Sequence, residues 1–289
     1  MPKTINEGFS VLHSRLTPNL TETSSIISHR ASIKQCLESN FGMKNFFRTG
    51  STGNGTSISG YSDTDYFASI PPENLKNNSS TTLRQVKEAL AKRFPSTGVY
   101  VDSPAVVCPF GTSDAESFEI VPAHYLKKEN SHNVYDIPDG NSAWMKAGPL
   151  AHNQYVTDVN RSLSNKVKPL IRFIKAWKYY CNVPISSFYL EIRTVKFAEK
   201  ESSIVYSSDI RSIIKLMYDN DLSAVVDPTG ISGYIYPCKS DSKKSDALSK
   251  LNTAYSRSTK ARQEESDGNI KDAFYWWNMF YNGKFPSYY

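Results

Sequence analysis

A glycine-rich segment and two acidic residues lie close together in the first quarter of the chain, and together they suit a triphosphate and a metal ion. Gly50 and Ser51 open a Gly/Ser-rich loop, and Asp63 and Asp65 follow within sixteen residues of Gly50. Glycine lets backbone N–H groups approach and wrap phosphate oxygens. Carboxylates two positions apart on a strand point to the same face, where they can hold Mg²⁺. The segment therefore predicts the transfer of a nucleotidyl group.

Two-metal nucleotidyl transfer usually requires a third carboxylate from an adjacent strand. The sequence predicts a strand over 117–122, and Glu119 is the acidic residue within it. Alternation places Glu119 opposite the apolar side chains of this strand, where an unpaired carboxylate would be costly unless it binds a partner or a metal. Glu119 is therefore the predicted third metal ligand. Glu116, which is off register, and Asp114, in the preceding turn, remain alternatives.

The elements around these residues predict an α+β fold. Strands are expected over 45–49, 63–70, 99–110 and 117–122, and residues 125–152 read as a loop. Apolar residues at helical spacing predict helices over 4–17, 22–40, 82–94, 153–168, 169–181, 187–198, 208–218, 243–258 and 269–280. Strands with helices come first and helices follow. We therefore expect a nucleotidyltransferase lobe with a mixed sheet over 1–165 and a helical C-terminal lobe over 166–289, with the active site in the cleft between them.

The bulk composition is that of an ordinary globular protein and excludes several classes. The chain has 289 residues, a formal charge of +6, 21% charged and 12% aromatic residues. No apolar run approaches the roughly 20 residues that cross a bilayer, and residues 1–7 carry no apolar signal core. The four cysteines form no Cys-x-x-Cys pair and the five histidines no zinc spacing. These observations favour a cytoplasmic protein without membrane partners, and the mild charge does not by itself imply nucleic-acid binding.

A basic stripe marks one predicted helix of the C-terminal lobe. Lys168, Arg172 and Lys175 recur at helical spacing and would form a cationic face. Such a face can bind phosphate groups, and the alternative is a solvated helix surface. Several tyrosines, including Tyr61 and Tyr189, could stack on nucleobases, although core packing is the simpler interpretation for any one of them.

Longer motifs make a family resemblance specific. Gly50-Ser51, Gly55-Thr56, Ser62-Asp63-Thr64-Asp65 and the segment 118–123 resemble the nucleotidyltransferase signature of the CD-NTase enzymes, the bacterial relatives of cyclic GMP-AMP synthase. The segments 170–177, 183–191, 273–280 and Phe285-Pro286 extend the likeness through nearly the whole chain. The catalytic motif alone would indicate only the polymerase-β-like superfamily. The C-terminal segments narrow the resemblance to the CD-NTases.

The resemblance implies roles for particular residues. Gly50 and Ser51 would contact the donor triphosphate, and Asp63, Asp65 and Glu119 would hold Mg²⁺, with Mn²⁺ as an alternative. Lys175 would reach the β- and γ-phosphates with Ser187 beside it, although Ser187 also suits a helix N-cap. The family usually has Asp at the third metal position, so Glu119 is a departure. Glu is one methylene longer and still offers carboxylate oxygens to Mg²⁺.

The implied activity is the synthesis of a cyclic di- or trinucleotide second messenger from nucleoside triphosphates, such as ATP, GTP or pyrimidine nucleotides, with release of pyrophosphate. The resemblance implies a role in antiphage (CBASS-type) defence, in which a downstream effector recognises the product. No Cys/His insertion resembles a duplex-reading zinc ribbon, so activity is expected without nucleic acid. The alternatives are another polymerase-β-like nucleotidyltransferase acting on RNA or a small molecule, and an inactive nucleotide-binding sensor.

Overall fold

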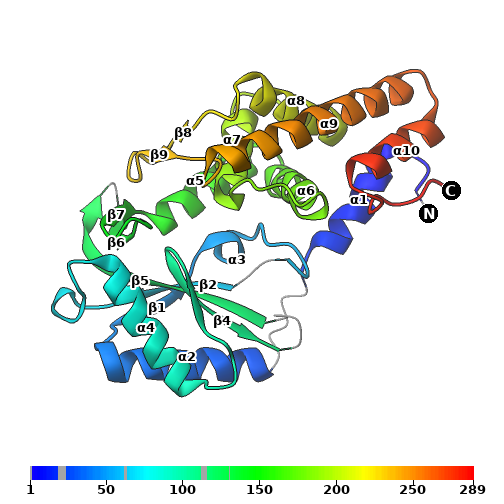
Figure 1. Ribbon diagram of the computed structural model, residues 1–289. Coiled ribbons are helices and arrows are strands. Elements are labelled where there is room, and N and C mark those ends of the chain that lie inside the picture. The colour runs from blue at the N-terminus through cyan, green and yellow to red at the C-terminus, as the bar shows by residue number, and fades with distance from the viewer. Residues whose placement is uncertain (1, 19–23, 62–63, 112–115, 130) are drawn as a thin grey trace.

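A mixed sheet forms the centre of the N-terminal half in the computed structural model (Figure 1), which describes residues 2–18, 24–61, 64–111, 116–129 and 131–289. Within these residues the sheet has the strand order β1-β2-β5-β4-β3, and β6 and β7 continue it from β5. The strands are β1 (Asn45–Arg48), β2 (Thr64–Ser69), β3 (Tyr100–Asp102), β4 (Ala105–Phe110), β5 (Glu116–Glu129), β6 (His132–Pro138) and β7 (Trp144–Ala147). β2 and β5 are parallel, whereas the other pairs are antiparallel.

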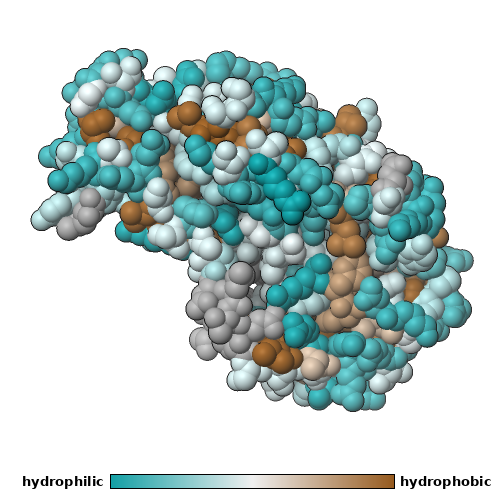
Figure 2. Space-filling view, turned by 180° about the vertical axis from the view of Figure 1, so that it is seen from behind, coloured by the Kyte–Doolittle hydropathy of each residue, from teal (hydrophilic) through white to brown (hydrophobic). Residues whose placement is uncertain are grey.

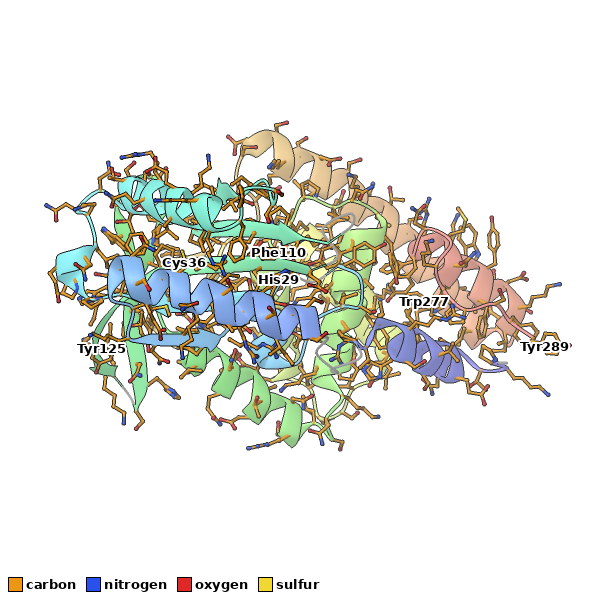
Figure 3. All side chains as sticks on the ribbon, turned by 90° about the horizontal axis from the view of Figure 1, so that it is seen from below. His29, Cys36, Phe110, Tyr125, Trp277 and Tyr289 are labelled. Atoms are coloured by element: carbon orange, nitrogen blue, oxygen red, sulfur yellow. The ribbon has the colours of Figure 1, made fainter. Side chains whose placement is uncertain are left out.

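Helices α2 (Ser24–Phe41) and α4 (Ser79–Arg93) cover one face of this sheet (Figure 1). Side chains at alternate strand positions, among them Tyr66, Phe118 and Ile120, point into the apolar cluster beneath these helices, as expected for a half-buried sheet. The ring of His29 on α2 stacks on Phe110 of β4 at 3.9 Å between centroids (Figure 3). One face of the sheet is therefore closed, and the other is available for a site.

The helical half lies over the opposite face. It contains α5 (Pro149–Ser162), α6 (Val167–Tyr180), α7 (Ser187–Ala198), α8 (Tyr206–Asp219), α9 (Asp241–Ser266) and α10 (Ile270–Phe280), with a short hairpin of β8 (Val225–Val226) and β9 (Tyr234–Ile235). The N-terminal helix α1 (Ile5–Leu16) also packs here, because Phe9 contacts the rings of Phe173 and Trp277 at 5.0 and 5.1 Å. Both termini therefore lie at the far end of the helical half, near Trp277 (Figures 1 and 3).

The α+β fold with a mixed sheet is confirmed, but the loop expected over 125–152 is wrong. Residues of that segment continue β5, form β6 and β7, and begin α5. Asp139 and Gly140 lie in the turn between β6 and β7, where the Asp139 carboxylate accepts hydrogen bonds from the N–H groups of Asn141 and Ala143, at 2.7 and 3.0 Å. Antiparallel pairing between distant residues supplied the hydrogen bonds that local sequence patterns do not reveal.

Two further local predictions need correction. The strand expected over 99–110 is a hairpin of β3 and β4, in which Asp102 pairs with Ala105 around Pro104. The Gly/Ser segment is not wholly a loop, because Gly50–Asn54 forms the short helix α3, which ends at Gly55 in the left-handed conformation. Glycine tolerates that conformation without steric cost, so it is common where a helix stops. The boundary between lobes at 165–166 stays a prediction.

Candidate active site

Two of the predicted carboxylates meet on the open face of the sheet. The register of the parallel pair β2–β5 places Asp65 directly opposite Glu119. Both line one cavity, together with Phe67 and Val121 two residues further along each strand. The structure therefore brings Asp65 and Glu119 together, whereas Asp63 lies outside the described residues. The alternative, Glu116 of β5, contacts α2 instead: its carboxylate accepts a hydrogen bond from Ser25 and lies 3.2 Å from His29 Nδ1.

The start of α3 is fitted against the Asp65 carboxylate. The N–H of Thr49 donates to the Asp65 carbonyl oxygen at 2.9 Å, which fixes this end of the segment on β2. Gly50 follows with a φ of +57°, and a Cβ atom added there would lie 1.9 Å from Asp65 Oδ2. Only a residue without a side chain leaves that carboxylate in place. Gly50 and Ser51 both line the cavity beside Asp65.

Gly50→Ala is expected to reduce catalytic activity about a hundredfold, because the new methyl group must displace the Asp65 carboxylate, and misplacement of a reacting group by about 1 Å has an effect of that size. The left-handed backbone adds about 1–2 kcal/mol of strain. Steady-state release of pyrophosphate and the midpoint of thermal unfolding measure the two effects.

Gly268→Ala is the matched control, since Gly268 also has a positive φ, of +81°, but an added Cβ meets nothing within 4 Å. It should show the backbone strain without the loss of activity. Equal losses of activity in the two variants would contradict a specific role for the space at Gly50.

The cavity that holds these groups has a volume of about 700 Å³, within the 300–1,000 Å³ usual for small-molecule sites. Its sheet side includes Asp65, Glu119 and Lys146. Its helical side includes Lys178, Ser187 and the segment 234–236. Carboxylates and lysines around one cavity suit a ligand that carries both phosphate groups and bound metal ions.

Lys175 does not point freely into this cavity. It is 2% exposed, and its Nζ lies 2.6 Å from Glu191 Oε2 on α7 and 3.2 Å from Thr56 Oγ1. Glu191 also accepts hydrogen bonds from the Thr56 hydroxyl, at 2.6 Å, and from the Asn54 amide. We call these four side chains, Asn54, Thr56, Lys175 and Glu191, the buried hub. The hub ties the end of α3 to α6 and α7.

Burial favours the neutral form of Glu191, but the adjacent Lys175 ammonium and the hydrogen bonds from Lys175, Thr56 and Asn54 outweigh it and lower its pKa. Arg172 of the basic stripe holds the same segment. The Arg172 guanidinium donates to the carbonyl oxygens of Gly55 and Ser57 at 2.8 and 3.0 Å, whereas Lys168 donates to Thr157 Oγ1 of α5 at 3.3 Å. The stripe is therefore not a solvated face, because its members bond to neighbouring elements, and two of them hold the chain that follows α3.

Lys178, one turn beyond Lys175, is the lysine that adjoins Ser187. Its Nζ lies 2.5 Å from Ser187 Oγ and 4.8 Å from the centre of the Tyr179 ring. The Tyr179 hydroxyl also contacts Ser187 Oγ, at 3.2 Å, and its ring stacks on Tyr61. Ser187 is the first residue of α7, and Ser186 is its N-cap, accepting from the Tyr189 N–H. Sequence reasoning missed Lys178, although it continues the helical spacing of the basic stripe.

Mg²⁺ suits the residues present at the carboxylate pair. Two adjacent carboxylates on parallel strands open into the cavity, and hard oxygen ligands are the ones that Mg²⁺ prefers. No group of three acidic, histidine or cysteine side chains is close enough to hold a metal within the described ranges, which do not include Asp63. The three-carboxylate set therefore stays a prediction.

A carboxylate pair on a mixed sheet, a fitted glycine segment beside it and a helical half above form the arrangement expected of a nucleotidyltransferase. Residues 3–160 match the family described as the Second Messenger Oligonucleotide or Dinucleotide Synthetase domain. The chain therefore belongs to this family, and the resemblance to CD-NTases is confirmed. A search of curated proteins finds no significant match.

Solved structures support the fold. Vibrio cholerae DncV cyclic AMP-GMP synthase, in complex with the linear intermediate 5′ pppA(3′,5′)pG, superposes with a TM-score of 0.76 at 14% identity over 99% of this chain and 98% of that chain. E. coli MS115-1 CdnC with ATP gives a TM-score of 0.75 at 13% identity, over 97% of this chain and 98% of its own. Elizabethkingia meningoseptica CdnE cyclic dinucleotide synthase gives 0.62 at 19% identity, over 84% and 94%.

Among the described residues, none of the helices combines the length and the apolar character that a membrane span requires. Figure 2 shows one face of the molecule, on which polar residues predominate and apolar residues form scattered groups.

Proposed function

We propose that this protein joins nucleoside triphosphates into a cyclic di- or trinucleotide second messenger and releases pyrophosphate, in CBASS-type antiphage defence. The pairing of Asp65 with Glu119 in one cavity with Gly50 and Ser51 is the observation that carries the proposal. The family to which the chain belongs supports the product class. The ligands of its structural relatives, ATP in CdnC and a linear intermediate in DncV, support nucleotide substrates.

Asp63, Asp65 and Glu119 would hold Mg²⁺ or Mn²⁺, which neutralises triphosphate charge and lowers the pKa of an attacking hydroxyl. The first turn of α3 and Ser51 would orient the phosphates, because N–H groups at the start of a helix have no partner within the helix. A ribose hydroxyl then attacks the α-phosphorus in line and pyrophosphate leaves. The linear product must be seated again so that the same carboxylates act on the second bond.

Mass spectrometry of the products formed from all four nucleoside triphosphates tests the proposal. A product resistant to phosphatase, with the mass of a cyclic di- or trinucleotide, is the expected result, and no nucleic acid should be needed. Labelled RNA or a labelled small molecule in an acceptor screen would instead favour another nucleotidyltransferase. Tight nucleotide binding without turnover, with either Mg²⁺ or Mn²⁺, would favour the inactive sensor. Glu119 is the feature that suggests this alternative, because the family usually has Asp at that position.

Lys178→Ala is expected to raise the KM for nucleoside triphosphate about 10-fold to 100-fold, the size expected when a hydrogen bond from a charged group is lost. The reason is that Lys178 lines the cavity beside Ser187, where its ammonium can meet a phosphate group. Initial rates of pyrophosphate release at varied nucleotide concentration provide the measurement.

Lys271→Ala, which removes an exposed lysine of α10, should leave KM unchanged. A normal KM for Lys178→Ala would remove this lysine from the phosphate site.

A further inference from the structure

A turn of the helical half, far from the catalytic segment in sequence, forms part of the cavity wall. Ser232, Tyr234 and Tyr236 lie in or beside the β8–β9 hairpin and line the same cavity as Asp65 and Glu119. We call these three residues the hairpin wall. In Figure 1 the hairpin projects from the helical half on the side where β6 and β7 lie.

One buried carboxylate organises the turn that precedes this wall. The Asp227 side chain is fully buried and accepts hydrogen bonds from the N–H groups of Thr229, Ile231 and Ser232, at 2.9, 3.1 and 2.7 Å, and from the Thr229 hydroxyl. Buried carboxylates need several such partners to offset their desolvation. The turn is therefore a built structure, and its shape depends on Asp227.

The same carboxylate fixes the turn to α5. His152 Nε2 lies 2.9 Å from Asp227 Oδ1, and the His152 ring itself lines the cavity. Ile231 packs against Gly148 at the start of α5, where an added Cβ would lie 2.4 Å from its Cδ1 atom. The turn before the hairpin wall is thus held to α5 by the contact between His152 and Asp227 and by one close apolar contact.

The hairpin wall adjoins the end of the cavity that Lys178 and Ser187 line. The Ser186 N–H donates to the Pro237 carbonyl oxygen at 2.7 Å, so the residue after Tyr236 touches the residue before Ser187. Tyr234 and Tyr236 are 64% and 69% exposed, and at alternate positions of an extended chain their rings face the same way. Two exposed aromatic rings beside a phosphate-binding end are suited to stacking on a base.

We infer that the hairpin wall contacts the base of the nucleotide whose triphosphate lies at Lys178 and Ser187, and that Asp227 is the positioning residue that holds this wall. The inference rests on the proposed function for the identity of the ligand. The hairpin wall would then contribute to nucleotide affinity through the base, while the carboxylates and Lys178 act on the phosphates.

Calorimetric titration separates these contributions. The probes are α,β-methylene analogues of ATP and GTP, which cannot release pyrophosphate, and inorganic tripolyphosphate, which has no base. Tyr234→Ala and Tyr236→Ala are expected to weaken binding of the nucleotide analogues about tenfold, the usual size of one base–aromatic stack, and to leave tripolyphosphate binding unchanged. Tyr275→Ala, at an exposed ring of α10, should change neither.

Asp227→Asn should reproduce the result of the tyrosine variants, since the amide cannot accept every hydrogen bond of the turn. Asp209→Asn is its matched control: Asp209 is a buried carboxylate that accepts the Val205 N–H on α8, away from the cavity.

Unchanged affinity for both analogues in the two tyrosine variants, or an equal loss for tripolyphosphate, would overturn the inference. If the wild-type protein binds the analogues but forms no product from nucleoside triphosphates, the proposed function fails, and the base contact is still decided by the titration.

Discussion

Asp65→Asn is expected to lower the rate of pyrophosphate release about a hundredfold to a thousandfold while leaving the fold intact. The substitution keeps the shape of the side chain but removes a charge from the carboxylate pair that we propose as the catalytic centre, and losing one such electrostatic contribution typically costs a factor of 10² to 10³. Asp65 pairs with Glu119 across β2 and β5. The described residues of β2 contain no second carboxylate that could replace Asp65.

The expected effect on stability has the opposite sign. Two carboxylates side by side repel each other, so neutralising one should leave the free energy of unfolding equal or slightly higher in the absence of divalent metal. Mg²⁺ should raise the thermal midpoint of the wild-type protein, because a ligand that binds only the folded state stabilises it, and should raise that of Asp65→Asn much less. Thermal unfolding with and without Mg²⁺ measures this difference.

Asp136→Asn is the matched control, because Asp136 lies on β6 of the same sheet but does not line the cavity. It should keep both the rate and the response to Mg²⁺. If Asp65→Asn retained more than a tenth of the wild-type rate, the carboxylate pair could not be the catalytic centre.

Lys175→Met is expected to lower the free energy of unfolding by about 3–5 kcal/mol, the range observed when one partner of a buried ion pair is removed. Its Glu191 partner is 6% exposed and would keep a charge in an apolar setting. Urea unfolding followed by circular dichroism measures the change. Lys271→Met, at an exposed position of α10, should change the free energy of unfolding by less than about 0.5 kcal/mol.

The double variant Lys175→Met with Glu191→Gln should recover at least half of the lost stability, because it removes both charges and keeps an acceptor for Thr56 and Asn54. Activity measured at low temperature should recover with it. If Lys175 instead acts on the triphosphate, the single variant would remain stable and the double variant would remain inactive.

The loss of stability should also depend on pH. In the wild-type protein the pKa of Glu191 is lowered, so its contribution is present above the pKa of the unfolded chain and is lost as the pH falls. Without Lys175, burial dominates and the pKa of Glu191 should be raised. The folded variant then holds a proton that the unfolded chain releases, so its stability falls as the pH rises above about 4. The difference between the two proteins should be smaller at pH 5 than at pH 8.

Alternation within one strand was enough to predict that Glu119 faces away from the core, on the side where it pairs with Asp65. The side-chain period of two assigned Phe118 and Ile120 to the core and Glu119 to the opposite face, and the structure has this arrangement. The same logic could not reveal the strands of 125–152, whose partners lie elsewhere in the chain, nor the α3 helix, which is five residues long and contains two glycines.

The roles of the two lysines illustrate what helical spacing leaves undecided. Lys175 and Lys178 both lie on α6, one turn apart, and both line the cavity. Lys175 meets Glu191 and Lys178 meets Ser187 because of where α7 lies, and the position of α7 does not follow from the sequence of α6. The resemblance to the family implied a phosphate-binding role for Lys175, whereas the geometry favours Lys178.

Three features of this protein could be predicted from the sequence alone: a glycine segment, acidic residues at strand spacing and an α+β order of elements. They depend only on residue type and on periods of two or 3.6 residues along the chain. Tertiary structure alone decided which charged groups meet one another in and around the cavity. Whether a buried side chain has a structural role depends on the group that packs against it. Here Glu191 lies 16 residues from Lys175 and Asp227 lies 75 residues from His152, so local sequence patterns do not reveal either contact.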